Sequence, residues 1–145
     1  MQNLIPKQEE EERLKALAEY RILGTKPESC YDDITKIAAS TCDVPISLMT
    51  LVDRDKQWFK SKVGLEINET PRDWSFCTHA IKENSPLVIN DAFQDERFIN
   101  NPLVTHDPKI RFYAGFPLRN RDGNKLGTLC AVSYTHLTLP TNREV

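Results

Sequence analysis

The stretch ISLMTLVDRDKQWFKSKVG, residues 46–64, contains two predicted β-strands joined by a short turn. Residues 46–52 are almost continuously apolar, which is typical of a central strand that is covered on both faces. Residues 57–64 instead alternate, which predicts a half-exposed strand. Because only residues 53–56 separate the two segments, we expect them to pair antiparallel. The alternation sets Trp58, Lys60 and Lys62 against Phe59, Ser61 and Val63.

Three more strands are predicted further along the chain. PLVINDA, residues 86–92, is the first of them. IRFYAGFPL, residues 110–118, and KLGTLCAV, residues 125–132, follow it, and the turn-forming sequence NRDGN separates the two. This arrangement predicts a closing β-hairpin in the same sheet.

Two helices are predicted before the strands. Residues 8–20 consist of helix formers and place Leu14, Leu17 and Ala18 at i, i+3 and i+4, with Gly24 as the stop signal. Thr25 is the expected cap of a second helix, which Val44-Pro45 ends. The predicted apolar stripe of this second helix is Tyr31, Ile34, Ile37, Ala38 and Thr41.

A short third helix is expected from a Ser75 cap through Asn84, between strands. Because helices gather at the beginning and strands dominate the rest, the chain is predicted to be an α+β domain built on one antiparallel sheet. Residues 1–24 would hold the N-terminal helix, residues 25–132 the domain itself, and residues 133–145 a separate tail.

Composition and charge exclude several functional classes. The 145 residues include 19 basic and 21 acidic side chains, a net charge of -2, which does not favour nucleic-acid binding. No signal peptide or membrane-length apolar run is present, so a cytoplasmic protein without membrane contact is expected. The four cysteines, Cys30, Cys42, Cys77 and Cys130, form no C-x-x-C pair, and neither a metal site nor a disulfide framework is expected.

Five segments follow one another along the chain: QWFKSKVGL, ETPRDWSFCTHAI, LVINDAFQDERFINNPLV, IRFYAGFPL and GNKLGTLC. Together they resemble a bacterial GAF domain. The resemblance covers about residues 13–132 and implies a GAF-type antiparallel sheet, with the N-terminal helices on one face and a short helix plus loops covering the other. It also implies a sensory input module of signal-transduction proteins such as histidine kinases in two-component systems, diguanylate cyclases and phosphatases. Such a module binds a small molecule or transmits a signal through helical contacts, here as a homodimer formed by the N-terminal helix.

The same resemblance implies a ligand pocket between the sheet and its covering loops and short helix. Aromatic walls with few polar groups suit a small organic ligand. Alternatively, the aromatic residues are simply core, and Arg111 forms a structural ion pair with Asp91 or Asp95. The implied lining residues are Trp74, Phe76, Asp91, Phe98, Arg111 and Tyr113.

Cys77 and His79 could add chemistry to this pocket. Residues i and i+2 of a helix point about 200° apart, so the pair is not a metal chelate. Cys77 shares a face with Ala80 and Ile81, which predicts packing against the sheet, although its position in a first helical turn would also suit a redox-responsive thiolate. His79 is expected to hydrogen-bond Glu83 at i+4. Haem ligation by His79 and bilin attachment at Cys77 are both disfavoured. The sequence signature of cyclic-nucleotide GAF domains is also missing. No cofactor is therefore assigned.

Two alternatives remain open. One is a ligand-free dimerisation module. The other is an enzyme similar to the GAF-type reductases of free methionine sulfoxide, but Cys30, Cys42 and Cys130 lack the glycine-rich surroundings of that family, so no catalytic constellation is expected. After Val132 the resemblance fades, and residues 133–145 look like translated sequencing-adapter sequence, which predicts a truncated frame without its output domain.

Overall fold

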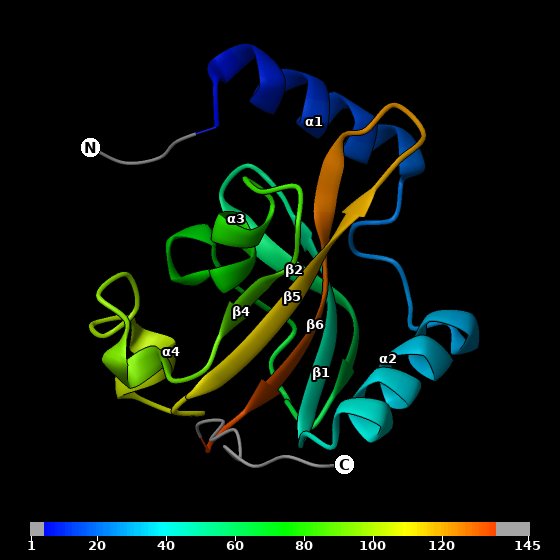
Figure 1. Ribbon diagram of the computed structural model, residues 1–145. Helices are drawn as coiled ribbons and strands as arrows, with labels where there is room; N and C mark the ends of the chain where they lie inside the picture. The colour runs from blue at the N-terminus through cyan, green and yellow to red at the C-terminus, as the bar shows by residue number, and fades with distance from the viewer. Residues whose placement is uncertain (1–4, 136–145) are drawn as a thin grey trace.

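A six-stranded antiparallel sheet, in the order β3-β2-β1-β6-β5-β4, forms the centre of the protein (Figure 1). The computed structural model describes residues 5–135. Helices α1 and α2 pack on one face of the sheet, and α3 with its neighbouring loops covers the other, so the predicted α+β fold is confirmed. The helices are α1 (Lys7–Tyr20), α2 (Ser29–Cys42), α3 (Phe76–Ala80) and α4 (Pro102–Thr105), with 3-10 turns η1 (Arg72–Trp74) and η2 (Ala92–Gln94); the strands are β1 (Ile46–Val52), β2 (Lys56–Val63), β3 (Glu69–Pro71), β4 (Leu87–Ile89), β5 (Phe112–Arg119) and β6 (Lys125–Ser133).

The hairpin of β1 and β2 forms as predicted, but β2 is not half-exposed. All of β1 is buried, and in β2 the five residues 57–61 are buried on both faces. The pairing register explains part of the difference: Met49 lies opposite Ser61 and Thr50 opposite Phe59, so Lys60 is an extra residue in a β-bulge. The bulge breaks the simple alternation, and both Lys60 and Ser61 contact the α2 side of the sheet.

Helix α2 shows the clearest departure from the predicted apolar stripe. Ile34 is 43% exposed and Ile37 is 64% exposed, whereas Thr35 is the fully buried residue of this helix. The stripe was wrong because the inner face of α2 meets polar side chains of β2. The helix also begins at Ser29, after Glu28 at the cap position, and the predicted cap, Thr25, lies outside the helix.

Smaller corrections concern α1 and α3. In α1, Leu14 and Leu17 are buried as predicted. Ala18, predicted on the same apolar face, is exposed, whereas the Arg13 side chain is buried. Helix α1 ends at Tyr20 as predicted, but the residue in the left-handed region that follows it is Arg21, not Gly24. Ser75 does cap α3, because its hydroxyl accepts a hydrogen bond from the Thr78 N–H at 3.0 Å, but that helix ends at Ala80 instead of residue 84.

Candidate functional site

The aromatic residues of the predicted pocket contact one another beneath α3. The Phe76 ring, carried by α3, stacks on Phe98 with 4.2 Å between centroids and lies 5.1 Å from the Tyr113 ring of β5. All three are buried. The His79 ring meets Phe98 edge-on at 4.9 Å. In this structure, therefore, the rings fill the space between α3 and the sheet.

Cys77 lies at the centre of a small polar cluster beside these rings. Its sulfur is 2.9 Å from the Thr128 hydroxyl and accepts a hydrogen bond from the Tyr113 hydroxyl at 3.2 Å. Thr128 in turn lies 3.2 Å from the Thr50 hydroxyl. The prediction that Cys77 packs against the sheet with Ala80 and Ile81 is confirmed, since all three are buried. Burial opposes ionisation of Cys77, but hydrogen bonds from Cys130, Thr128, Thr50 and Tyr113 lower its pKa to about 7.

The cluster depends on a second thiol and on a glycine. The hydrogen bond to Cys77, together with burial, raises the pKa of the Cys130 thiol well above its usual range, so Cys77 is the more acidic of the two. At Gly115 an added Cβ would lie 2.1 Å from the Tyr113 hydroxyl. Only glycine therefore leaves room for the Tyr113 side chain to reach Cys77.

The other predicted site residues lie around this core rather than in it. Trp74 is 37% exposed, and its carbonyl accepts a hydrogen bond from Asn101. Asp91 caps η2 by accepting from the Phe93 N–H. Arg111 donates to the carbonyls of Val104 and Ile110, and its guanidinium lies 4.9 Å from the Phe93 ring.

On this side, Asp95 and His79 depart from the expected pairs Arg111–Asp95 and His79–Glu83, whereas the alternative pair Arg111–Asp91 stays a prediction. Asp95 bonds Arg97 through both carboxylate oxygens, at 3.0 and 2.7 Å, and so does not serve as the partner of Arg111. Because α3 ends at Ala80, Glu83 is not one helical turn beyond His79. Burial, with the positive charges of Lys82 and Arg97, lowers the pKa of His79, which favours the neutral ring.

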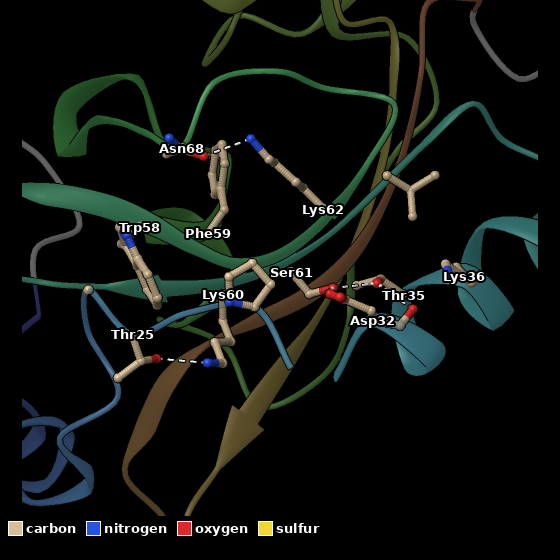
Figure 2. A pocket seen from close by; sticks show the side chains of 13 residues that line it. Thr25, Asp32, Thr35, Lys36, Trp58, Phe59, Lys60, Ser61, Lys62 and Asn68 are labelled. Atoms are coloured by element: carbon tan, nitrogen blue, oxygen red, sulfur yellow. Dashed lines mark hydrogen bonds between the residues drawn. The ribbon is translucent and has the colours of Figure 1, made fainter. Parts of the chain in front are cut away.

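A hollow of about 450 Å³ lies on the opposite side of the sheet, between α2, the loop before it and β2 (Figure 2). The Lys60 side chain, which is 0% exposed, reaches into its wall. Its ammonium donates to the Thr25 hydroxyl at 2.7 Å and the Lys26 carbonyl at 2.6 Å, and it pairs with the Glu28 carboxylate at 2.7 Å. The charge is thus fully compensated within the wall.

Ser61 completes the polar wall of this hollow. Its hydroxyl donates to the Asp32 carboxylate at 2.6 Å and lies 2.6 Å from the Thr35 hydroxyl. These residues were not predicted from the sequence. Asp32 and Thr35 are three positions apart on α2 and share a face, so their spacing was a sequence signal for a polar inner face of this helix. The bulge at Lys60 has no such signal in the sequence.

The sequence profile of the GAF domain matches residues 26–144. The chain belongs to the GAF domain family. The match extends beyond Val132, where the resemblance was expected to fade; the expected separate tail of residues 133–145 lies largely outside the described residues.

Relatives of this GAF domain include a signalling enzyme. The chain is 37% identical over 125 residues to a cyclic di-GMP phosphodiesterase of Pseudomonas aeruginosa, an alignment that covers 86% of the chain and 21% of the phosphodiesterase. The chain therefore spans about a fifth of the length of this relative.

Solved structures show the same fold. The GAF domain of an Acinetobacter phosphoenolpyruvate-protein phosphotransferase has a TM-score of 0.59 at 14% identity, with 94% of this chain and 84% of that one covered. A free methionine-R-sulfoxide reductase from Neisseria meningitidis, in complex with its substrate, has a TM-score of 0.61 at 18% identity, with 97% and 85% covered. At these identities the likeness concerns the fold alone.

Within residues 5–135, His, Cys, Asp and Glu side chains form no group of three or more suited to a metal ion. In the same part of the chain, no helix has the length and apolarity needed to cross a membrane.

Proposed function

We propose that this GAF domain is a regulatory module of a bacterial signal-transduction protein and responds to a small organic molecule held between α3 and the sheet. The observation that carries the proposal is the match to the cyclic di-GMP phosphodiesterase, of which this chain corresponds to about one fifth. A segment of this size within a much longer signalling enzyme fits an input domain. The output we expect is accordingly cyclic di-GMP hydrolysis, in place of the kinase or cyclase output suggested by the sequence alone.

The arrangement beneath α3 supports a ligand site of this class. Small-molecule sites combine apolar and aromatic walls with a few polar groups that orient the ligand. Here Phe76 and Phe98 supply the rings, and the hydroxyls of Tyr113 and Thr128 with the Cys77 thiol supply the polar centre. A ligand would enter by separating Phe76 from Phe98, with Trp74, His79, Asp91 and Arg111 at the rim.

The test is native mass spectrometry of the domain purified from its own host, with denatured samples run in parallel. We expect a retained small molecule that is lost in Phe98→Trp, which overfills the space under α3. Ile37→Gln on the opposite side of the sheet is the matched control and should retain the molecule. Retention by both variants would place the ligand elsewhere, and a mass without any adduct would favour the ligand-free dimerisation module.

We also propose that α1 forms the contact of a homodimer. Lys15 and Ala18 are exposed and lie three positions apart on this helix, so they share a face that a second copy could cover. Sedimentation equilibrium should give the mass of a dimer for the wild type and of a monomer for Ala18→Glu. Equal masses for the two proteins would argue against α1 as the contact.

The reductase alternative has one observation in its favour, the contact between the buried thiols of Cys77 and Cys130. An assay with free methionine sulfoxide and a thiol reductant separates it from a regulatory module. We expect no turnover above the level of the Cys77→Ser variant. Turnover abolished by that substitution would replace the regulatory proposal with an enzymatic one.

A further inference from the structure

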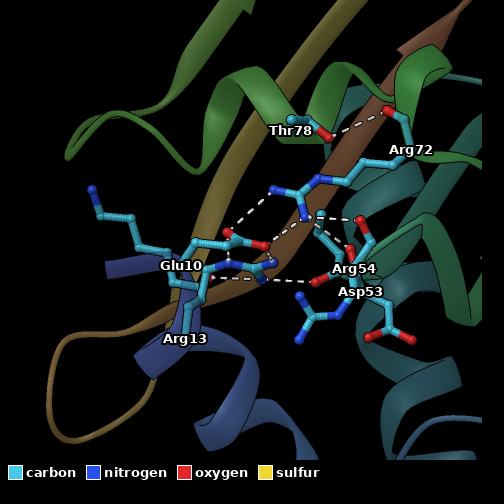
Figure 3. Close-up of polar contacts among 8 residues, drawn as sticks. Glu10, Arg13, Asp53, Arg54, Arg72 and Thr78 are labelled. Atoms are coloured by element: carbon cyan, nitrogen blue, oxygen red, sulfur yellow. Dashed lines mark hydrogen bonds and ion pairs between the residues drawn. The ribbon is translucent and has the colours of Figure 1, made fainter. Parts of the chain in front are cut away.

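A group of three charged residues links the N-terminal helix to the element that precedes α3 (Figure 3). On α1, the Arg13 guanidinium donates two hydrogen bonds of 3.0 Å to the Glu10 carboxylate. Arg13 also donates to the carbonyl of Val52 at 2.7 Å, where β1 ends. Arg13 thereby holds Glu10 in place against the end of the sheet.

The second guanidinium comes from the 3-10 turn that precedes α3. Arg72, in η1, donates to the same Glu10 carboxylate at 2.6 and 3.3 Å. It also donates to the carbonyls of Asp53 and Arg54, in the turn between β1 and β2. One carboxylate is therefore shared by two arginines that belong to different elements.

The three side chains are largely shielded from solvent, and the Glu10 carboxylate stays ionised. The side chains of Glu10, Arg13 and Arg72 are 19%, 4% and 18% exposed. Burial raises the pKa of Glu10, but the hydrogen bonds and charges of Arg13 and Arg72 outweigh it and lower the pKa to about 2. Charge-assisted, two-pronged hydrogen bonds of this kind are directional as well as strong.

Arg72 is tied directly to the first turn of α3. Its carbonyl accepts the Ser75 N–H at 2.9 Å and the Thr78 hydroxyl at 3.5 Å. The Ser75 hydroxyl caps the helix and also donates to Gln57 at 2.7 Å. A displacement at the start of α3 therefore moves the backbone that carries the Arg72 guanidinium.

We propose that Glu10 couples α1 to α3, so that a change at the α3 face of the domain is passed to the N-terminal helix through Arg72. The distal half of α1 is anchored differently, by Ala16 and Leu17 packed with Leu126. Beside the proximal half lies a hollow of about 550 Å³, lined on its far side by residues 81–84 and 122–125. The proximal half thus has room to move when its polar anchor changes.

The coupling can be measured by hydrogen–deuterium exchange without any ligand, so its failure is distinguishable from failure of the proposed sensory function. Ser75→Ala removes the cap and serves as the perturbation at α3. In the otherwise wild-type domain it should speed exchange of the α1 amides from residue 10 to residue 14. In a Glu10→Gln background these amides should already exchange roughly tenfold faster, the loss expected for one charged hydrogen-bonded pair, and should no longer respond to Ser75→Ala.

Glu9→Gln is the matched control, because it removes the same charge from the neighbouring, exposed position of α1. It should leave α1 exchange and its response to Ser75→Ala unchanged. If Ser75→Ala speeds exchange of the α1 amides equally in the wild-type and Glu10→Gln backgrounds, the proposal is overturned. The perturbation would then reach α1 through the sheet and not through Glu10.

A second perturbation covers the case in which Ser75→Ala does not fold. Arg72→Lys keeps the charge but loses the two-pronged contact. It should speed α1 exchange about as much as Glu10→Gln does, and the double variant should be no faster than either single variant. Additive increases in the double variant would show that the two residues act independently.

Discussion

Helices α3 and α2 are held to opposite faces of the sheet by different forces. Beneath α3 the contacts are apolar and aromatic, with Phe76 stacked on Phe98 and the polar atoms confined to a small cluster around Cys77. Beneath α2 they are polar, with Lys60 and Ser61 bonded to the helix and its leading loop. The α2 side also leaves a hollow of about 450 Å³ and turns Ile34 and Ile37 outward. One sheet can thus hold one helix by close apolar packing, as beneath α3, and another by hydrogen bonding, as beneath α2.

The largest effect should come from the packed face. Phe98→Ala removes a fully buried ring from its stack with Phe76 and should lower the free energy of unfolding by about 3–5 kcal/mol, because the lost transfer energy is added to the cost of a cavity. Urea denaturation measures this. Phe116→Ala, at a partly exposed ring of β5, is the control and should cost much less. Similar losses for both would mean that the α3 face is not the tightly packed one.

An intermediate effect is expected from the polar face. Lys60→Met keeps the length of the side chain but leaves Thr25 and the Lys26 carbonyl without their donor, which should cost about 2 kcal/mol of unfolding free energy. Lys36→Met on the exposed side of α2 should be nearly neutral in the same denaturation experiment. If Lys60→Met instead stabilises the domain, apolar packing is preferred there and the contrast between the faces fails.

The polar cluster inside the packed face should respond more weakly. Cys77→Ser finds partners already present, the Tyr113 and Thr128 hydroxyls, and should cost about 1 kcal/mol. Cys77→Val leaves the buried Tyr113 hydroxyl without its acceptor and should cost more. Denaturation midpoints decide the order. A thiol reagent offers a check on burial, because Cys30 and Cys42 are exposed and should be labelled much faster than Cys77.

The smallest effect is expected at the outer face of α2. Ile37→Gln should change the free energy of unfolding by less than about 0.5 kcal/mol, since the side chain is mostly exposed. Thr35→Val, two residues away on the buried face, breaks the contact with Ser61 and is the comparison. A loss at Ile37 larger than that at Thr35 would restore the apolar stripe predicted from the sequence.

Several features were readable before the structure because they depend on neighbouring residues. The continuous apolar run of β1 predicted a strand buried on both faces, and Ser75 was identified as a cap from its residue type and position. The burial of Cys77 followed from that cap, since it sets the face on which Cys77, Ala80 and Ile81 lie. Each of these predictions needed only local periodicity and capping chemistry.

The sequence by itself therefore determined the order of α1, α2 and α3, the strands β1, β2, β4, β5 and β6, and the hairpins β1–β2 and β5–β6. It did not predict β3 or α4, and the aromatic residues under α3 were expected from the resemblance to GAF domains. The tertiary structure alone decided that Lys60 is an extra residue in β2, that α2 turns its isoleucines outward and that Glu10 meets Arg72. The physical reason is that a bulge, a helix rotation and an ion pair between residues 62 positions apart depend on which surfaces meet, and local periodicity carries no record of the partner surface.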